Sequence, residues 1–153
     1  MQTLRQSKGE WAGKPLLLLP WQVDIVGHIY GTLRPDGNRQ YRTAFIEVPR
    51  KNGKSSLCAA LALYHLIADG ESGAEVYLAA VDRDQAAIVF GIAADMVRQH
   101  PALRKRLQVV PSTRRIVDVA TSSMLRVIAS DAGGSHGFNA SCVIADEVHA
   151  WPS

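Results

Sequence analysis

One turn between an apolar run and a helical run constrains the fold of this chain most. The apolar run ends at Val48, a short polar turn follows, and Gly53-Lys54-Ser55 then open a stretch rich in alanine and leucine. A strand, turn and helix in this order direct backbone N–H groups and a helix N-terminus toward one point, which suits an anion. In this pattern the lysine reaches nucleotide phosphates and the serine hydroxyl ligates Mg²⁺. The candidate nucleotide-binding residues are Pro49, Arg50, Lys51, Asn52, Gly53, Lys54 and Ser55.

The match to the standard phosphate-binding pattern is incomplete. Its first glycine should stand at position 48, where this chain has valine. Gly-Lys-Ser is also common by chance, so the motif alone is compatible with an ordinary strand–turn–helix.

A second motif supports nucleotide chemistry. Ser141–Ala145 is a short apolar run typical of a buried parallel strand, and Asp146-Glu147 follow it directly. Ligands of open α/β sheets bind at the carboxyl ends of strands, and buried carboxylates are costly without a partner. We assign Asp146 to Mg²⁺ and Glu147 to the deprotonation of the attacking water. A solvated acidic turn is the alternative, but the presence of Lys54 in the same domain favours an ATPase that uses ATP and Mg²⁺.

Composition places the chain among ordinary globular domains. Its 153 residues suffice for one domain with a core, and 47% are hydrophobic. The run Leu16–Leu19 is too short to span a bilayer, and Cys58 and Cys142 suit the core of a protein in a reducing compartment. The net charge of +3 and a basic cluster at Arg104–Arg106 permit a nucleic-acid partner without demonstrating one.

Apolar periodicity and turn residues predict alternating helices and strands. We expect helices over residues 21–30, 54–68 and 82–100, and strands over 41–48, 74–80, 115–119, 124–129 and 141–145. A glycine-containing loop is expected over residues 131–139. This alternation predicts an α/β fold with an open, mostly parallel sheet and helices on both faces. Such a sheet normally continues beyond its acidic motif, so we expect residues 1–153 to be the N-terminal part of a longer P-loop ATPase domain.

Taken together, the motifs resemble the ATPase domain of the large terminase subunit, which packages the genomes of tailed phages. The phosphate loop of that family often lacks its first glycine and carries a basic residue in its middle, as this loop does. Four segments carry the resemblance in the family's order: Leu19–Gln22, Val48–Ser55, Ala79–Ala86 and Val143–Trp151.

The resemblance implies a P-loop NTPase fold of the additional-strand, catalytic-glutamate type. It further implies that Gln22 contacts adenine and that Arg50 contacts the γ phosphate and acts in catalysis beside Glu147. The partners it implies are double-stranded DNA, further copies of the chain in a ring, the small terminase subunit and the portal, in the host cytoplasm and away from membranes. The family's C-terminal nuclease domain is not in these residues, and its trans-acting arginine has no identifiable counterpart; the loop at Gly134–Gly137 offers His136 instead.

Two other functions remain compatible with the sequence. Asp146-Glu147-Val148-His149 spells the Asp-Glu-x-His box of nucleic-acid helicases, although helicases usually keep the glycine that Val48 replaces. A non-catalytic binding module descended from an ATPase is the other alternative. The presence of both Lys54 and Glu147 argues against it.

Overall fold

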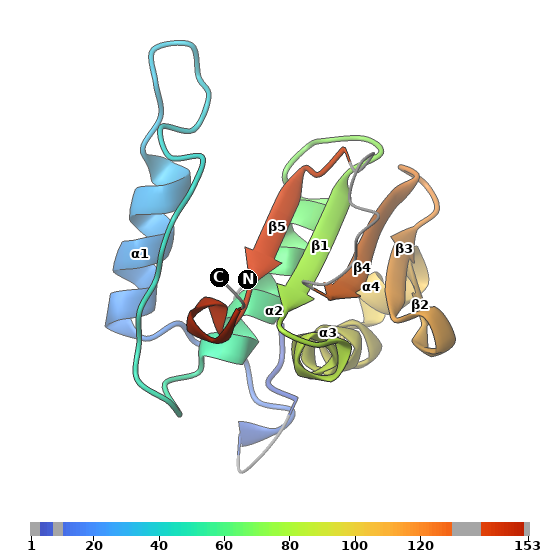
Figure 1. Ribbon diagram of the computed structural model, residues 1–153. Coiled ribbons are helices and arrows are strands. Elements are labelled where there is room, and N and C mark those ends of the chain that lie inside the picture. Colours follow the sequence, from blue (N-terminus) through green and yellow to red (C-terminus); the bar gives the residue numbers. More distant parts are fainter. Residues whose placement is uncertain (1–3, 8–10, 130–138, 152–153) are drawn as a thin grey trace.

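The computed structural model describes residues 4–7, 11–129 and 139–151. Its centre is a five-stranded sheet in the order β2-β3-β4-β1-β5 (Figure 1). The strands are β1 (Glu75–Ala80), β2 (Leu107–Val110), β3 (Arg115–Asp118), β4 (Ser123–Ala129) and β5 (Cys142–Ala145). Central strand β1 pairs in parallel with β4 on one side and with β5 on the other, and β3 is antiparallel to both β2 and β4. Four strands therefore run in one direction, so the mostly parallel sheet is confirmed.

The helices are α1 (Pro20–Gly31), α2 (Lys54–Ile67), α3 (Arg83–Gln99) and α4 (Pro101–Arg106), with short 3₁₀ helices η2 (Pro111–Thr113) and η3 (Val148–Ala150). Alanine and leucine, which have high helix propensity, make up half of α2. The side chain of Asp82 caps α3 by accepting hydrogen bonds from the N–H groups of Asp84 and Gln85. Pro101 ends α3 and begins α4. None of the described helices is both long and apolar enough to cross a membrane.

The hydrophobic core lies between the sheet and the two long helices. Helices α2 and α3 pack against each other and against both β1 and β4 (Figure 1). Alternate residues of the strands face these helices, because successive strand side chains point to opposite faces. The fully or nearly fully buried members include Ala59, Leu63, Leu66, Val76, Leu78, Val89, Met96, Ile116 and Leu125. This core fixes the start of α2 close to the carboxyl ends of β1 and β5.

Most predicted elements are confirmed within one or two residues, but the strand predicted over residues 41–48 is wrong. Among the described residues this segment has no strand partner, and it runs as an irregular connection from the hairpin after α1 down to α2 (Figure 1). Tyr41 and Phe45 are exposed there, at 47% and 76%. Alternating β-branched and aromatic residues favour a strand only where a neighbouring strand supplies hydrogen bonds. Strand β5 pairs only with β1 in the described part of the chain.

One further difference concerns the second half of the chain. Strand β2 was not predicted, because its four residues directly follow α4 and its partner β3 lies beyond a turn. The strands predicted over residues 115–119 and 124–129 are confirmed, and they form the antiparallel pair β3–β4. The loop predicted over residues 131–139, with His136, lies outside the described residues except for Asn139.

Candidate active site

The phosphate-loop candidates form a tight turn at the start of α2. Gly53 is the N-cap residue of α2 and has φ = 75°, a left-handed conformation that glycine adopts without steric cost. Lys51 also has a positive φ of 68°. The side-chain amide of Asn52 donates to the carbonyl oxygens of Pro49 (3.1 Å) and Arg50 (3.3 Å) and so closes the turn on itself. The loop therefore leaves the first N–H groups of α2 without intrahelical partners, as an anion site requires.

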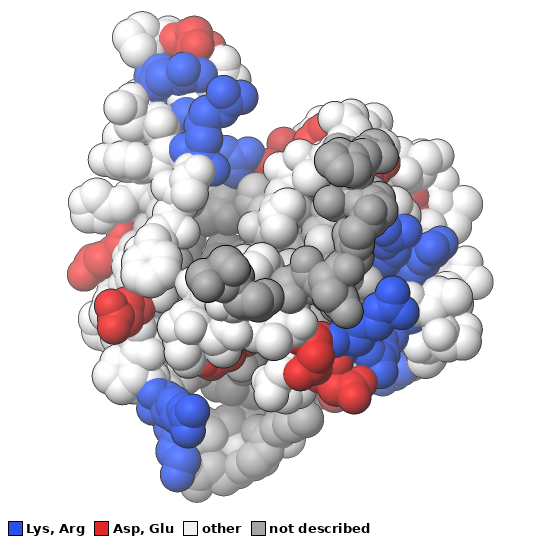
Figure 2. Space-filling view, viewed as in Figure 1, with Lys and Arg blue, Asp and Glu red and all other residues white. Residues whose placement is uncertain are grey.

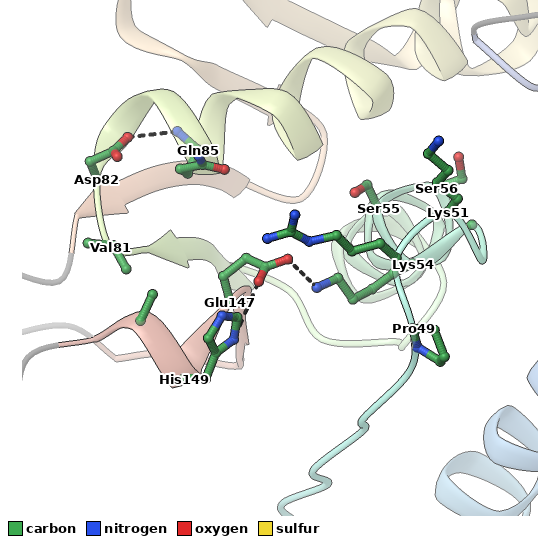
Figure 3. Close-up of a pocket in the computed structure, with 13 residues that line it drawn as sticks. Pro49, Lys51, Lys54, Ser55, Ser56, Val81, Asp82, Gln85, Glu147 and His149 are labelled. Atoms are coloured by element: carbon green, nitrogen blue, oxygen red, sulfur yellow. Dashed lines mark hydrogen bonds and ion pairs between the residues drawn. The ribbon is translucent and has the colours of Figure 1, made fainter.

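Lys54 and the two carboxylates meet at this turn. The Lys54 ammonium donates to Oε1 of Glu147 at 2.6 Å and lies 3.0 Å from Oδ1 of Asp146. Residues far apart in the sequence meet because β5 and the start of α2 both lie at the carboxyl edge of the sheet. The two motifs predicted from the sequence thus form a single site (Figure 3).

These contacts perturb the protonation of both partners. Burial opposes the charge on Lys54, but hydrogen bonds to Glu147 and Asp146 outweigh it and raise the pKa of Lys54 above its usual value. The hydrogen bond from Lys54 is the main reason that the pKa of Glu147 is lowered. Both groups are charged at neutral pH. Glu147 is a weak base while Lys54 holds it, because a lowered pKa reduces its tendency to accept a proton.

The chain turns sharply at Glu147. The N–H of Asp146 donates to the carbonyl of Ala79 at 2.8 Å and so continues the β5–β1 ladder. Glu147 then adopts φ = 52°, a left-handed conformation uncommon for a residue with a side chain, before η3 begins. Its N–H donates to Oδ1 of Asp146, and the Trp151 indole donates to the Asp146 carbonyl. This network fixes the turn from which the Glu147 side chain extends toward Lys54 (Figure 3).

A cleft of about 670 Å³ opens beside this ion pair. Of the predicted residues, it is lined by Pro49, Arg50, Lys51, Gly53, Lys54, Ser55 and Glu147. The lining also includes residues that the sequence did not single out for the site, among them Asp82, Gln85 and His149 (Figure 3). Asp82 and Gln85 come soon after the end of β1. Their position at the carboxyl edge of a parallel sheet, where ligands bind, was the sequence signal that could have identified them. Asn52 and Asp146 do not line the cleft. Asn52 acts on it by closing the loop, and Asp146 acts on it through its contact with Lys54.

Gln22 lies apart from the lining of this cleft but close to the phosphate loop. The residue is only 4% exposed, and its Oε1 accepts a hydrogen bond from the N–H of Leu19 at 3.0 Å. A methyl group built on Gly53 would lie 3.4 Å from Nε2 of Gln22. Gln22 therefore caps α1, and its amide lies next to the N-cap residue of α2.

The residues assigned to Mg²⁺ suit that ion. Mg²⁺ is usually held by one or two carboxylates together with waters and substrate phosphates. Oδ1 of Asp146 contacts Lys54 and the N–H of Glu147, which leaves Oδ2 as a ligand. Ser55 lines the cleft one residue after Lys54. One hydroxyl and one carboxylate match this ion when phosphate oxygens complete its shell.

Comparison with known proteins agrees with this geometry. Residues 20–153 match the terminase large subunit, ATPase domain. The chain belongs to this family. The large terminase subunit of Enterobacteria phage HK97 is 29% identical over 141 residues, which cover 92% of this chain. The crystal structure of the HK97 large terminase matches with a TM-score of 0.79 and 26% identity over 94% of this chain. The ATPase domain of the Thermus phage P74-26 large terminase shares the fold, with a TM-score of 0.56 and 24% identity over 67% of this chain and 47% of its own.

Membership in the terminase ATPase family confirms the resemblance and the P-loop NTPase fold, and it favours a terminase over a helicase or a non-catalytic module. The chain spans 27% of the length of the HK97 large subunit. The activities and partners of a whole terminase are therefore matters for proposal.

Proposed function

We propose that this chain is the ATP-hydrolysing part of a motor that drives double-stranded DNA into a phage procapsid. The observation that carries the proposal is the contact of Lys54 with Glu147 beside a cleft lined by the phosphate loop. The loop, the lysine and the acidic strand end are the parts that nucleoside triphosphate hydrolysis requires.

Nucleotide binding is assigned to the loop and to α1. The N–H groups at Gly53 and at the start of α2 bind phosphate oxygens, and Lys54 neutralises the β and γ phosphates. Arg50 lines the same cleft, and its planar guanidinium can donate to two γ-phosphate oxygens at once. The Nε2 group of Gln22 can donate a hydrogen bond to a ring nitrogen of adenine. Its Oε1 has a second lone pair, which can accept a hydrogen bond from the adenine amino group.

Hydrolysis is assigned to Glu147. When the Lys54 ammonium binds phosphate oxygens instead of Glu147, the Glu147 carboxylate loses its strongest hydrogen bond and becomes a better base. It then orients a water molecule and accepts its proton as the water oxygen bonds to the γ phosphorus and ADP leaves. Ser55 and Asp146 would hold Mg²⁺, which offsets phosphate charge when bound.

The DNA-packaging part of the proposal rests on the family. Figure 2 shows Lys and Arg side chains over the hairpin that follows α1 and over the β3–β4 side of the sheet, interspersed with acidic side chains. In the hairpin, Arg34 pairs with Asp36, and Arg39 pairs with Asp69. This distribution permits contact with a phosphate backbone. We further propose that copies of the chain form a homo-oligomeric ring. This ring would act with the small terminase subunit and the portal in the host cytoplasm.

A substitution at Lys54 tests the site. In the intact protein, Lys54→Ala should abolish ATP hydrolysis and weaken ATP binding, because the ammonium that faces the phosphates is lost. Lys105→Ala is the matched control, since Lys105 is exposed in α4 and remote from the cleft. Steady-state phosphate release measures both variants. Unchanged turnover in Lys54→Ala would refute the assignment.

A further inference from the structure

Four polar side chains outside the cleft join the far ends of α1 and α2. Tyr30, Arg39, His65 and Asp69, here named the polar clamp, come from the last turns of α1 and α2 and from the residues that follow each helix. The Tyr30 hydroxyl lies 2.8 Å from Nε2 of His65, and Nδ1 of His65 lies 3.0 Å from Oδ2 of Asp69. Arg39 donates to the same Oδ2 at 2.5 Å, and its guanidinium carbon lies 5.2 Å from the centre of the Tyr30 ring.

The chemistry of these groups gives each hydrogen bond a direction. An ionised carboxylate only accepts, so Nδ1 of His65 carries a proton and donates it to Asp69. In the neutral ring Nε2 is then an acceptor, and the Tyr30 hydroxyl donates to it. Burial lowers the pKa of His65, against the opposing effect of Asp69, so the neutral ring prevails at pH 7. Every member of the clamp thus has a matched partner.

Helix α1 has no fully buried apolar residue. Gln22 is its only buried residue; Trp21, Ile25, Val26 and Ile29 are half-buried, and Val23 is 53% exposed. A helix whose apolar residues are only partly covered depends more on specific contacts for its position. For α1 such contacts lie at its two ends: Gln22 lies close to Gly53 of the phosphate loop, and Tyr30 belongs to the polar clamp and packs on the Tyr64 ring.

We propose that the polar clamp positions α1 and thereby holds Gln22 against the phosphate loop, so that residues remote from the cleft set its affinity for ATP. The inference rests on the proposed function. Clamp residues are positioning residues, since they act on nucleotide only through α1 and Gln22. The two ends of α1 are joined by one continuous helix, which transmits a displacement of one end to the other.

Tyr30→Phe tests this proposal, because it removes the clamp hydroxyl and keeps the ring. In the intact protein we expect Kd and KM for ATP to rise by up to roughly tenfold, the worth of one hydrogen bond, with kcat unchanged. Tyr64→Phe is the matched control. The Tyr64 ring packs 5.1 Å from that of Tyr30, but its hydroxyl has no hydrogen bond among the described residues. This control should bind ATP as the wild type does.

A double-mutant cycle separates positioning from general destabilisation. If the clamp acts through Gln22, the double variant Tyr30→Phe/Gln22→Ala binds ATP as weakly as Gln22→Ala alone. Independent, additive losses would overturn the proposal, as would an unchanged Kd in Tyr30→Phe.

Hydrogen exchange tests the mechanical link without ATP. The N–H groups of Gln22 and Val23, which donate to the Leu19 carbonyl, should exchange faster in Tyr30→Phe and at the wild-type rate in Tyr64→Phe. Equal exchange in all three proteins would refute the link. If the three proteins show this exchange pattern but the wild type does not bind ATP, the proposed function is refuted. The inference that the clamp positions α1 would still stand.

Discussion

Replacing Glu147 by glutamine should separate ATP binding from ATP hydrolysis. The substitution preserves the shape of the side chain and removes its charge. Hydrolysis should slow by roughly 10²–10⁴-fold, the usual contribution of a general base. Binding should change in the opposite direction, because Glu147 competes with nucleotide phosphates for the Lys54 ammonium, which it contacts at 2.6 Å.

The structure sets the size of the gain in affinity. A hydrogen bond between charged groups contributes about 1.5–3 kcal/mol. The side chains of Lys54 and Glu147 are 32% and 31% exposed, so water and salt screen part of this energy. Asp146 also keeps its contact with Lys54 at 3.0 Å. About 1 kcal/mol remains, which corresponds to ATP binding that is about fivefold tighter.

Calorimetric titration with ATP and single-turnover hydrolysis measure the two effects separately. Asp95→Asn makes the equivalent change from carboxylate to amide in α3, outside the cleft, so it should leave both quantities unchanged. Normal hydrolysis by Glu147→Gln would refute its role as the base. Weaker ATP binding by the same variant would refute the competition for Lys54.

Two further predictions concern stability. Because burial lowers the pKa of His65 in the folded protein, its contribution to stability is complete above about pH 6.5 and is lost as pH falls through the lowered pKa. Urea midpoints should therefore fall less between pH 7.5 and 5 in His65→Gln than in the wild type; equal losses would contradict this. Asp118 is fully buried, and hydrogen bonds from Arg106 overcome its burial and lower its pKa. Asp118→Asn should reduce the free energy of unfolding by about 2 kcal/mol, which is less than the roughly 3–5 kcal/mol of a fully buried pair because Arg106 is 41% exposed; an unchanged urea midpoint would contradict it.

The sequence predicted the two halves of the site because each motif is local. Apolar runs placed Lys54 at a helix start and Glu147 after a strand, and the convergence of parallel strand ends then implied that they meet. The cap of α3 by Asp82 is equally local, since a carboxylate before a helix accepts its first N–H groups.

Local sequence patterns could not predict features that depend on tertiary neighbours. Residues 41–48 have the composition of a strand, yet in the part of the chain that the structure describes no strand pairs with them to supply hydrogen bonds. The family resemblance implied an adenine contact for Gln22, but not its burial beside Gly53, because the approach of α1 to the loop depends on contacts far along the chain. His65 gave no sign of its link to Tyr30, because the two lie 35 residues apart.

A crystal structure of the intact protein with Mg²⁺ and a non-hydrolysable ATP analogue would test the central claim most directly. The account predicts phosphates at the N–H groups of Gly53 and the start of α2, with the Lys54 ammonium on phosphate oxygens and the Glu147 carboxylate released toward the γ phosphate. An analogue bound away from this loop, or phosphates in the cleft with Lys54 still paired to Glu147, would contradict it.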